Sequence, residues 1–544
     1  MNTSLSHPLA RVVYACVALI GLVLTLSGSP ATAQVTAFKQ AVAEASFGNE
    51  QIGAYYRSRD YQPLWTGEGE VFRARRAALF EALANVSLHG LPKARYDTAA
   101  LMAQMQEART TRDLGMVEVA LSRMFVRYAR DVQKGMLIPK KIDDGLVREV
   151  VYADNATYLG GMEKAKDPNA YMHTLPPASR EYRALMKEKL RLEGVVRNGG
   201  WGEKVPGAKF KPGATGNAVV ALRNRLITLG FLRATASRSY DSRLQAAVRE
   251  FQRKHGLEAD GVAGQSTIDE INRPATDRLK SVIVAMERER WLPAKRGKRH
   301  VLVNLADFRA QIVDDGYVTF STRSVVGKNQ SDRRSPEFSD MMELMVINPS
   351  WYVPRSIIVK EYLPQLQRNP NAVSHIKITD RRGRVVNRAN MDFSQFTRRN
   401  FPFAMTQPPS NRNALGLVKF LFPNKYNIYL HDTPAKSLFG REKRDFSHGC
   451  IRLQDPFDFA YTLLSRQSDD PKGLFQSTLA TRKETKIMLK QPIPVHLMYR
   501  TAFTTMKGGL EFRRDVYGRD AKIWKALNQA GVKLPGVELA AVQG

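Results

Sequence analysis

The spacing of hydrophobic residues changes along the chain, from a helical period in the first part to strand-like runs further on. Between residues 34 and 208, apolar side chains recur every three or four positions, which places them on one face of a helix. Two such sets are Leu79, Leu83 and Val86, and Leu121, Met124, Phe125 and Tyr128. The pattern predicts a helical scaffold domain over residues 34–208, with Trp65 in its core and no catalytic chemistry.

Three short amphipathic segments follow over residues 209–273. The apolar positions of the first two are Val219, Leu222, Leu226 and Leu229, then Leu244, Ala247, Val248 and Phe251. Gly230 ends the first helix, Asp241 is a suitable N-cap for the second, and Thr267 precedes a third. Three short helices can bury one small core. We therefore expect a separate three-helix module, in which His255 is a turn or core residue.

From residue 300 onward, short apolar runs separated by turn residues predict strands. These runs are residues 301–304, 310–313, 317–320 and 344–347, and later 417–420 and 427–430. We expect a β-rich, sandwich-like domain over residues 300–480, after a linker over 274–299 and before a C-terminal extension over 481–544. The strand pattern lapses over residues 352–406, which predicts an inserted lid or capping subdomain. The expected fold class of the whole chain is multidomain α+β.

The first 33 residues have the layout of a secretory signal peptide. Arg11 precedes an uncharged run over residues 12–26, and a small-residue stretch ends in Ala31-Thr32-Ala33, an A-x-A cleavage signal. The apolar run is shorter than the roughly 20 residues that a membrane span needs. We therefore expect export to the periplasm with removal of residues 1–33. An uncleaved membrane anchor is the alternative.

The chain carries a formal charge of +31, which indicates an anionic partner. Export argues against nucleic acid. In addition, the basic clusters at residues 295–299 and 381–384 are scattered and lack the interleaved aromatic residues of nucleic-acid sites. An anionic cell envelope suits the charge better, with most of these side chains forming solvated surface. A length of 544 residues and 43% hydrophobic residues fit a globular protein of several domains.

The use of cysteine singles out one residue. Of the two cysteines, Cys16 lies in the signal segment, so the exported chain would keep only Cys450. Exported proteins fold in oxidising compartments, where an unpaired cysteine is a candidate reactive thiol. Cys450 closes the run Ser447-His448-Gly449-Cys450, which follows His431 at a distance that a folded turn could span.

A catalytic thiol needs a neighbouring base, because at its free pKa of about 8.5 it is mostly protonated at neutral pH. Histidine is the usual base, and His431 and His448 both precede Cys450. Gly449 allows a sharp turn whose backbone N–H groups could hold an oxyanion. Two alternatives are an inert cysteine and a zinc site of His431, His448 and Cys450, although no ligand pair has a familiar zinc spacing.

These residues resemble the catalytic motif of the L,D-transpeptidase family, a histidine followed by S-H-G-C. The longer sequence is similar to the YcbB-like branch of that family over residues 348–354, 413–416, 422–424 and 429–456. Residues 247–264 of the three-helix module resemble the peptidoglycan-binding type 1 domain. The resemblance implies a helical scaffold, a peptidoglycan-binding domain, and a catalytic domain with an inserted capping subdomain.

The resemblance also implies that Cys450 is the nucleophile and His431 its base, oriented through the backbone carbonyl of Asp432. The thiolate would attack the third residue of a peptidoglycan tetrapeptide stem and expel the terminal D-alanine. The side-chain amine of a second stem would then attack the thioester and form a 3→3 cross-link. This chemistry requires neither a metal nor an organic cofactor.

Four further residues would shape the substrate site. The resemblance assigns His448 and Gly449 to the oxyanion pocket and Arg452 to a substrate carboxylate. It makes Ser447 either a substrate contact or a local backbone cap. Two other functions stay open: a cysteine carboxypeptidase or endopeptidase that trims stems with water as acceptor, and a non-catalytic wall-binding scaffold. The pairing of His431 with Cys450 argues against the scaffold.

Overall fold

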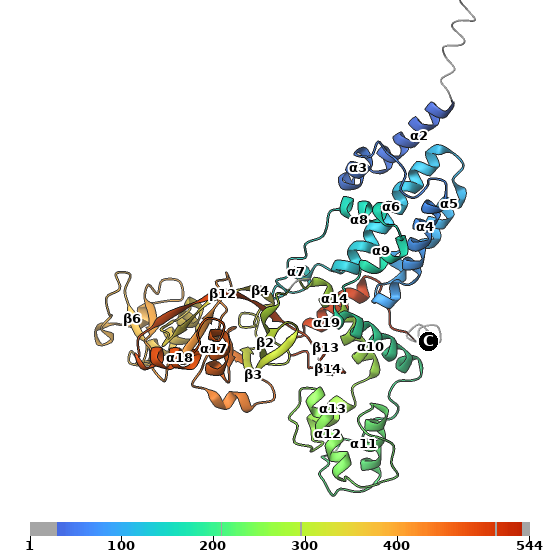
Figure 1. The fold of residues 1–544 in the computed structure, drawn as a ribbon. Helices are drawn as coiled ribbons and strands as arrows, with labels where there is room; N and C mark the ends of the chain where they lie inside the picture. Colours follow the sequence, from blue (N-terminus) through green and yellow to red (C-terminus); the bar gives the residue numbers. More distant parts are fainter. Residues whose placement is uncertain (1–29, 208, 294–295, 506–508, 536–544) are drawn as a thin grey trace, which may run out of the picture. The chain divides into compact units, whose positions relative to one another are not determined.

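The structure is a computed structural model that describes residues 30–207, 209–293, 296–505 and 509–535. It consists of two compact units (Figure 1). Unit 1 comprises the described residues up to 136 together with 150–178 and 528–533. Unit 2 comprises residues 137–149, 179–527 and the described residues from 534. Most of the predicted signal segment, including Cys16, lies outside the described residues.

Within the described ranges, no helix combines the length and the apolar composition that a membrane crossing requires.

Unit 1 is helical, as its periodicity predicts. Its elements are α2 (Pro30–Ala45), α3 (Glu50–Arg57), α4 (Glu70–Ala84), η1 (Val86–His89), η2 (Lys93–Arg95), α5 (Thr98–Glu107), α6 (Thr111–Lys134), α8 (Asn155–Lys164) and α9 (Pro168–Thr174). Thr110 and Asp113 form a capping box at the start of α6. Trp65 is fully buried, which confirms it as a core residue, and its indole N–H donates to Ser122 on α6 at 2.8 Å.

Unit 2 contains the expected three-helix module. After α7 (Pro139–Ile142) and α10 (Arg180–Arg197) come α11 (Asn217–Thr228), α12 (Ser242–Lys254) and α13 (Gln265–Ile271), which share one apolar core. Asp241 caps α12 by accepting from the Leu244 N–H at 2.8 Å. The guanidinium of Arg223 beside it lowers the pKa of Asp241 to about 2. His255 is buried and its ring stacks on that of Phe251, with the ring centroids 3.9 Å apart, which confirms His255 as a core residue.

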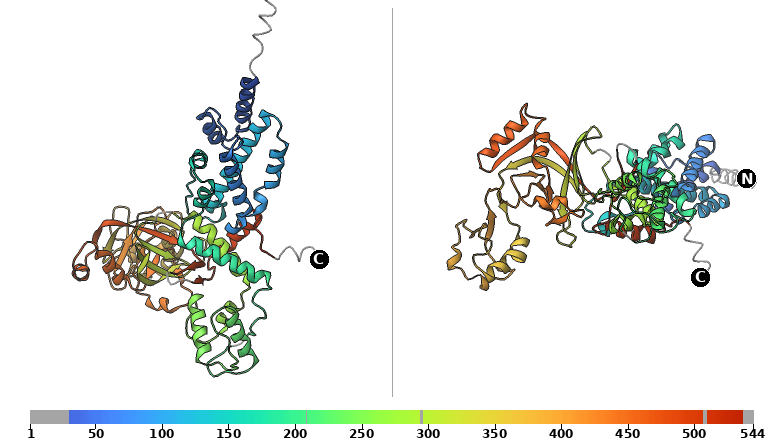
Figure 2. Two further views of the ribbon diagram at one scale, coloured as in Figure 1. Left: turned by 45° about the vertical axis from the view of Figure 1, so that its right-hand side comes forward. Right: turned by 90° about the horizontal axis from the view of Figure 1, so that it is seen from below.

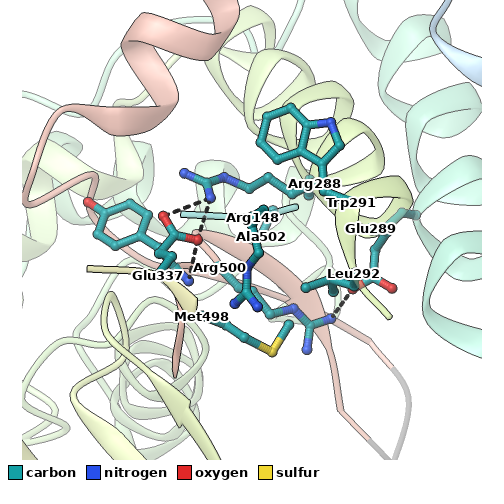
Figure 3. Close-up of a pocket in the computed structure, with 12 residues that line it drawn as sticks. Arg148, Arg288, Glu289, Trp291, Leu292, Glu337, Met498, Arg500 and Ala502 are labelled. Atoms are coloured by element: carbon teal, nitrogen blue, oxygen red, sulfur yellow. Dashed lines mark hydrogen bonds and ion pairs between the residues drawn. The ribbon is translucent and has the colours of Figure 1, made fainter. Parts of the chain in front are cut away.

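Residues 274–299 are not a linker, which corrects the sequence-based prediction. They contain α14 (Ala275–Trp291), which is buried along most of its length. The buried arginines of α14, which are Arg278, Arg288 and Arg290, each pair with a buried carboxylate. Figure 3 shows Arg288 of α14 bonded to Glu337 at 2.9 Å, and Arg288 also pairs with Asp520 at 2.8 Å. A buried charge is tolerated only when it is paired. The helix α14 can therefore be buried because Glu337 and Asp520, which lie far away in the sequence, pair with Arg288.

The β-rich part of unit 2 is one mixed sheet of nine strands. The strands are β1 (Arg299–Asn304), β2 (Arg309–Asp314), β3 (Tyr317–Gly327), β4 (Phe338–Ile347), β8 (Val418–Leu421), β9 (Leu430–His431), β10 (Asp445–Ser447), β11 (Ile451–Leu453) and β12 (Thr485–Met498). Their order is β10-β3-β11-β9-β8-β4-β12-β1-β2, and an additional pairing joins β2, at one end, to β3, the neighbour of β10 at the other end. The sheet therefore closes on itself around an apolar core.

Strand β12 corrects the predicted C-terminal extension over residues 481–544. It lies in the interior of the sheet, antiparallel to β4 and parallel to β1, so the large sheet continues well past residue 480. The remaining elements of this part are η6 (Lys436–Gly440), α17 (Pro456–Leu464), α18 (Pro471–Ala480), β13 (Ala502–Thr504), β14 (Leu510–Phe512) and α19 (Arg519–Gln529).

The segment between β5 (Trp351–Tyr352) and β7 (Ala404–Gln407) has a core of its own. It holds α15 (Arg355–Ile357), the π-helical turn η3 (Ile358–Tyr362), α16 (Leu363–Arg368), β6 (Lys377–Thr379), η4 (Arg388–Asn390) and η5 (Phe393–Gln395). Strands β5, β7 and β6 form a small separate sheet, and apolar side chains pack beneath it. The right-hand view of Figure 2 shows this segment, in gold, as a lobe beside the large sheet.

Candidate active site

Two neighbouring strands bring the predicted nucleophile and base together. Strands β9 and β11 pair in parallel, with Arg452 opposite His431, and Cys450 immediately precedes β11. Both Cys450 and His431 line an open cleft of about 650 Å³. Its other lining residues include Arg333, Trp351, Tyr352, Glu361, Tyr426, Asn427, Tyr429, Ser447, His448 and Arg452. The cleft is thus formed by the large sheet, the loop before β4 and the inserted lobe.

The turn that carries the thiol is held by hydrogen bonds of its own. Ser447 is buried, and its hydroxyl donates to the Cys450 carbonyl at 2.5 Å and accepts from the Gly449 N–H at 3.1 Å. The Ser335 hydroxyl donates to the Gly449 carbonyl at 2.6 Å. Gly449 has φ +119°, in the region that favours glycine, and a Cβ there would lie 3.1 Å from Ile428. The Ser447 hydroxyl therefore acts here within the backbone turn.

These bonds limit which N–H groups can hold an oxyanion. The Gly449 N–H is already bonded to Ser447. The Cys450 N–H has no acceptor among the residues that the structure describes. Of the two backbone donors, Cys450 is the one free to bind a developing negative charge.

The thiol of Cys450 is half-buried, and its hydrogen-bonding neighbours are uncharged. Its sulfur donates to the Asn427 carbonyl at 3.5 Å, and Tyr429 is a second hydrogen-bonding neighbour. Burial raises the pKa of Cys450 to about 11, despite the opposing effects of Tyr429 and the positive charge of Arg452. The thiol is therefore protonated at neutral pH in this structure.

The imidazole of His431 is buried and neutral. Burial, reinforced by the nearby Arg452 guanidinium, lowers the pKa of His431 to about 3, although the Asp432 and Leu415 carbonyls favour the protonated ring. Nδ1 lies 2.5 Å from the Asp432 carbonyl oxygen, so in the neutral ring Nδ1–H is the donor and Nε2 carries the lone pair. Among the described residues, no hydrogen bond joins this ring to the Cys450 sulfur.

The carboxylate of Asp432 acts on the loop behind the histidine. It accepts from the Leu417 N–H at 2.9 Å and from Lys436 at 2.6 Å. Gly416 must be glycine here, because it has φ +61° and a Cβ would lie 2.3 Å from the Asp432 carboxylate. The side chain of Asp432 thus fixes residues 415–418, and its carbonyl orients His431.

Arg452 lines the cleft and has no carboxylate partner among the residues that the structure describes. Its side chain is half-buried, and its Nε has no hydrogen-bond partner in the described part of the chain. Burial lowers the pKa of Arg452, and the Cys450 thiol opposes that shift. An unpaired guanidinium beside the thiol suits a bidentate bond to a carboxylate of a ligand.

The side chain of His448 points to the inserted lobe. Its Nε2 bonds the Glu361 carboxylate at 2.6 Å, and Arg333 donates to the same oxygen at 2.7 Å. The sequence reasoning missed Arg333 and Glu361, as well as Asn427 and Tyr429. Tyr429 could have been noticed two positions before His431, but no spacing rule connects Arg333 or Glu361 to Cys450.

Three protein families match separate parts of the chain. Residues 50–188 match a family described as "Scaffold domain", and residues 298–481 match the "L,D-transpeptidase catalytic domain". Residues 215–271 match a "Putative peptidoglycan binding domain". The matched ranges fall on the helical region, the sheet with its insertion, and the three-helix module.

Two curated proteins are similar to parts of this chain. One, from Haemophilus influenzae and described as "Putative L,D-transpeptidase", is 32% identical over 225 residues, 41% of this chain and 45% of that protein. The other is the N-acetylmuramoyl-L-alanine amidase CwlL of Bacillus licheniformis, which is 34% identical over 98 residues, 18% of this chain and 24% of CwlL. The chain thus spans less than half the length of each relative.

Two solved structures are also similar. An L,D-transpeptidase fragment from Xylanimonas cellulosilytica has 16% identity and a TM-score of 0.18, covering 54% of this chain and 98% of the other. An L,D-transpeptidase from Stackebrandtia nassauensis has 16% identity and a TM-score of 0.23, covering 54% and 96%.

Proposed function

Starting from a chain that contains an L,D-transpeptidase catalytic domain and a peptidoglycan-binding domain, we propose that the protein forms 3→3 peptidoglycan cross-links through a thioester on Cys450. One observation carries this proposal. Cys450, the one cysteine among the described residues, shares a cleft with His431, and the pairing of β9 with β11 sets their positions. The three matched domains also support assignment to the YcbB-like branch, which joins such parts.

In the first half-reaction, the Cys450 sulfur attacks the carbonyl of the third residue of a tetrapeptide stem. The S–C bond forms, the C–N bond to the terminal D-alanine breaks, and the thiol proton passes through Nε2 of His431 to the leaving amine. The Asp432 carbonyl holds Nδ1–H, which keeps Nε2 as the acceptor. Because His431 has a pKa of about 3 and Cys450 one of about 11, this proton moves together with S–C bond formation rather than before it.

Two groups in the cleft then bind negative charge on the donor stem. The Cys450 N–H donates to the oxyanion of the tetrahedral intermediate, since the Gly449 N–H is bonded to Ser447. Arg452 binds a carboxylate of the donor stem and holds the scissile carbonyl near the sulfur. Ser447 and Asp432 are positioning residues in this scheme, because their side chains bond the protein itself.

In the second half-reaction, the side-chain amine of an acceptor stem attacks the thioester and regenerates the thiol. Water would instead give the trimmed stem, which is the carboxypeptidase or endopeptidase activity. The inserted lobe lines the cleft with Trp351, Tyr352 and Glu361, and we propose that it limits the access of water to the thioester. The peptidoglycan substrate supports a periplasmic location. The charge of +31 supports association with the anionic envelope.

Mass spectrometry of the purified protein with tetrapeptide muropeptides tests the proposal. The wild type should gain the mass of the acylated tripeptide stem and release cross-linked dimers. Cys450→Ala should lose both products and keep its thermal unfolding transition. Dimer formation by folded Cys450→Ala would overturn the cysteine mechanism, and an acyl-enzyme that yields only trimmed stems would identify a hydrolase. Binding without any acyl-enzyme would leave the wall-binding scaffold as the function.

A further inference from the structure

At the edge of the cleft, one carboxylate of the chain lies between two cationic or hydrogen-bond-donating groups. An oxygen of Glu361 accepts from Arg333 at 2.7 Å and lies 2.6 Å from Nε2 of His448. Arg333 precedes β4, Glu361 lies on η3 of the inserted lobe, and His448 lies two residues before the nucleophile. All three line the cleft and are partly shielded, with side-chain exposures of 25%, 30% and 35% respectively.

The arrangement has the composition of a carboxylate-binding site. A guanidinium and an imidazole N–H that converge on one oxygen form charge-assisted hydrogen bonds, which are stronger than neutral ones. These residues line the same cleft as Cys450, so a stem bound for the proposed reaction lies within their reach. A peptidoglycan stem carries several free carboxylates, so a stem bound to Arg452 through one of them has others that a second site can bind.

We propose that Arg333 and His448 form a second carboxylate-binding subsite for the peptide stem, which Glu361 occupies in the substrate-free protein and leaves when a stem carboxylate binds. The inference rests on the proposed function, because that function supplies the ligand class. Glu361 is then an internal competitor. When a stem carboxylate binds Arg333, the ion pair between Arg333 and Glu361 is lost. The free energy of the new ion pair is therefore largely offset, and the net gain in affinity is small in the wild type.

A neighbouring ion pair provides a matched control. Lys360, next to Glu361, pairs with Asp332, next to Arg333, at 2.5 Å. This pair joins the same two segments as the Arg333–Glu361 pair does. Asp332→Asn therefore loosens the contact between them while leaving Arg333, His448 and Glu361 unchanged.

The test measures the Kd of a tetrapeptide muropeptide by calorimetry in the Cys450→Ala background, where no turnover occurs. Glu361→Gln should lower the Kd about tenfold, because the competing carboxylate is gone. Arg333→Gln alone should change the Kd less than about threefold, but adding it to Glu361→Gln should cancel the gain. Asp332→Asn should leave the Kd unchanged.

Stems amidated at one carboxylate at a time identify the group that is bound. The stem amidated at the carboxylate that the subsite binds should have the same Kd for the Glu361→Gln protein as for the protein that keeps Glu361. The other amidated stems should keep the tenfold difference in Kd between these two proteins. The proposal is overturned if Glu361→Gln leaves the Kd unchanged or raises it, if Asp332→Asn gives the same gain, or if every amidated stem keeps the difference. These readouts use no acyl transfer, so they are independent of whether wild-type protein forms the thioester.

Discussion

Cys450 and His431, the two side chains proposed to react, are each neutral in the cleft. Cys450 bonds to Asn427 and Tyr429, and His431 bonds to the carbonyl of Asp432. Burial acts in opposite directions on the two groups, since it raises the pKa of the thiol and lowers that of the imidazole. A thiolate–imidazolium pair is therefore unfavourable in this cleft, and a protonated thiol is oxidised less readily than a thiolate.

We expect the alkylation rate of Cys450 to rise about tenfold per pH unit and to level off near pH 11, because only the thiolate reacts. His431→Ala should move this curve by less than about one unit, since no hydrogen bond joins the two groups, yet slow acyl transfer about 10²–10⁴-fold. Iodoacetamide kinetics against pH and muropeptide turnover measure the two effects. A plateau near pH 7 that His431→Ala removes would contradict the neutral resting pair.

Gly416→Ala should destabilise the protein by roughly 1–3 kcal/mol and reduce turnover. The left-handed backbone and a Cβ 2.3 Å from the Asp432 carboxylate would force the loop that holds His431 to move. Gly440→Ala is the matched control on the same stretch, because a Cβ there meets nothing within 4 Å. Thermal unfolding and muropeptide assays report both effects. Equal behaviour of the two variants would show that this loop is not constrained.

Among the elements, those with a local periodic signal could be predicted from the sequence. The helices of unit 1 and α11 to α13 follow from apolar spacing, and the inserted lobe follows from the gap in strand pattern. The burial of α14 could not be predicted, because the partners of its charges, such as Glu337 and Asp520, lie far away in sequence. In the site, His431 and Cys450 were predictable from their motif, whereas Arg333 and Glu361 meet only through the tertiary fold.

Removal of the inserted lobe tests its role as an element. Strands β5 and β7 are antiparallel, with Tyr352 opposite Thr406, so a short turn can join them in place of the residues between. We expect this deletion variant to be acylated by a small activated ester about as fast as the wild type. With tetrapeptide stems, the ratio of cross-linked to hydrolysed product should fall, because water reaches the thioester. An unchanged ratio in a folded variant would refute a shielding role.

At the scale of the whole molecule, the proposed function requires net charge and modular composition to act together on an insoluble substrate. The charge of +31 attracts an anionic polymer over distances that salt shortens, since the screening length is about 10 Å at 0.1 M. The peptidoglycan-binding module adds contacts of shorter range. Under the proposed function, long-range attraction brings the protein to the wall, and the cleft carries out the chemistry.

Binding to isolated sacculi should therefore weaken several-fold between about 50 and 500 mM salt, whereas acylation by soluble muropeptides should change less than about twofold. Pelleting assays and mass spectrometry measure these two quantities on the same preparation. Uncharged cellulose provides the control surface. Salt-independent binding to sacculi would assign capture to the module rather than to the net charge.

The closed sheet also has a consequence for biogenesis. Strand β12 lies between β4 and β1, yet it follows both of them, and the Cys450 turn, in the chain. A polypeptide that emerges with its N-terminus first must therefore expose the edges of β1 and β4 until residue 498 has appeared. Bare strand edges invite pairing with other chains. The edges of β1 and β4 therefore need protection from such pairing until β12 has been added, although the segment that carries Cys450 has already emerged.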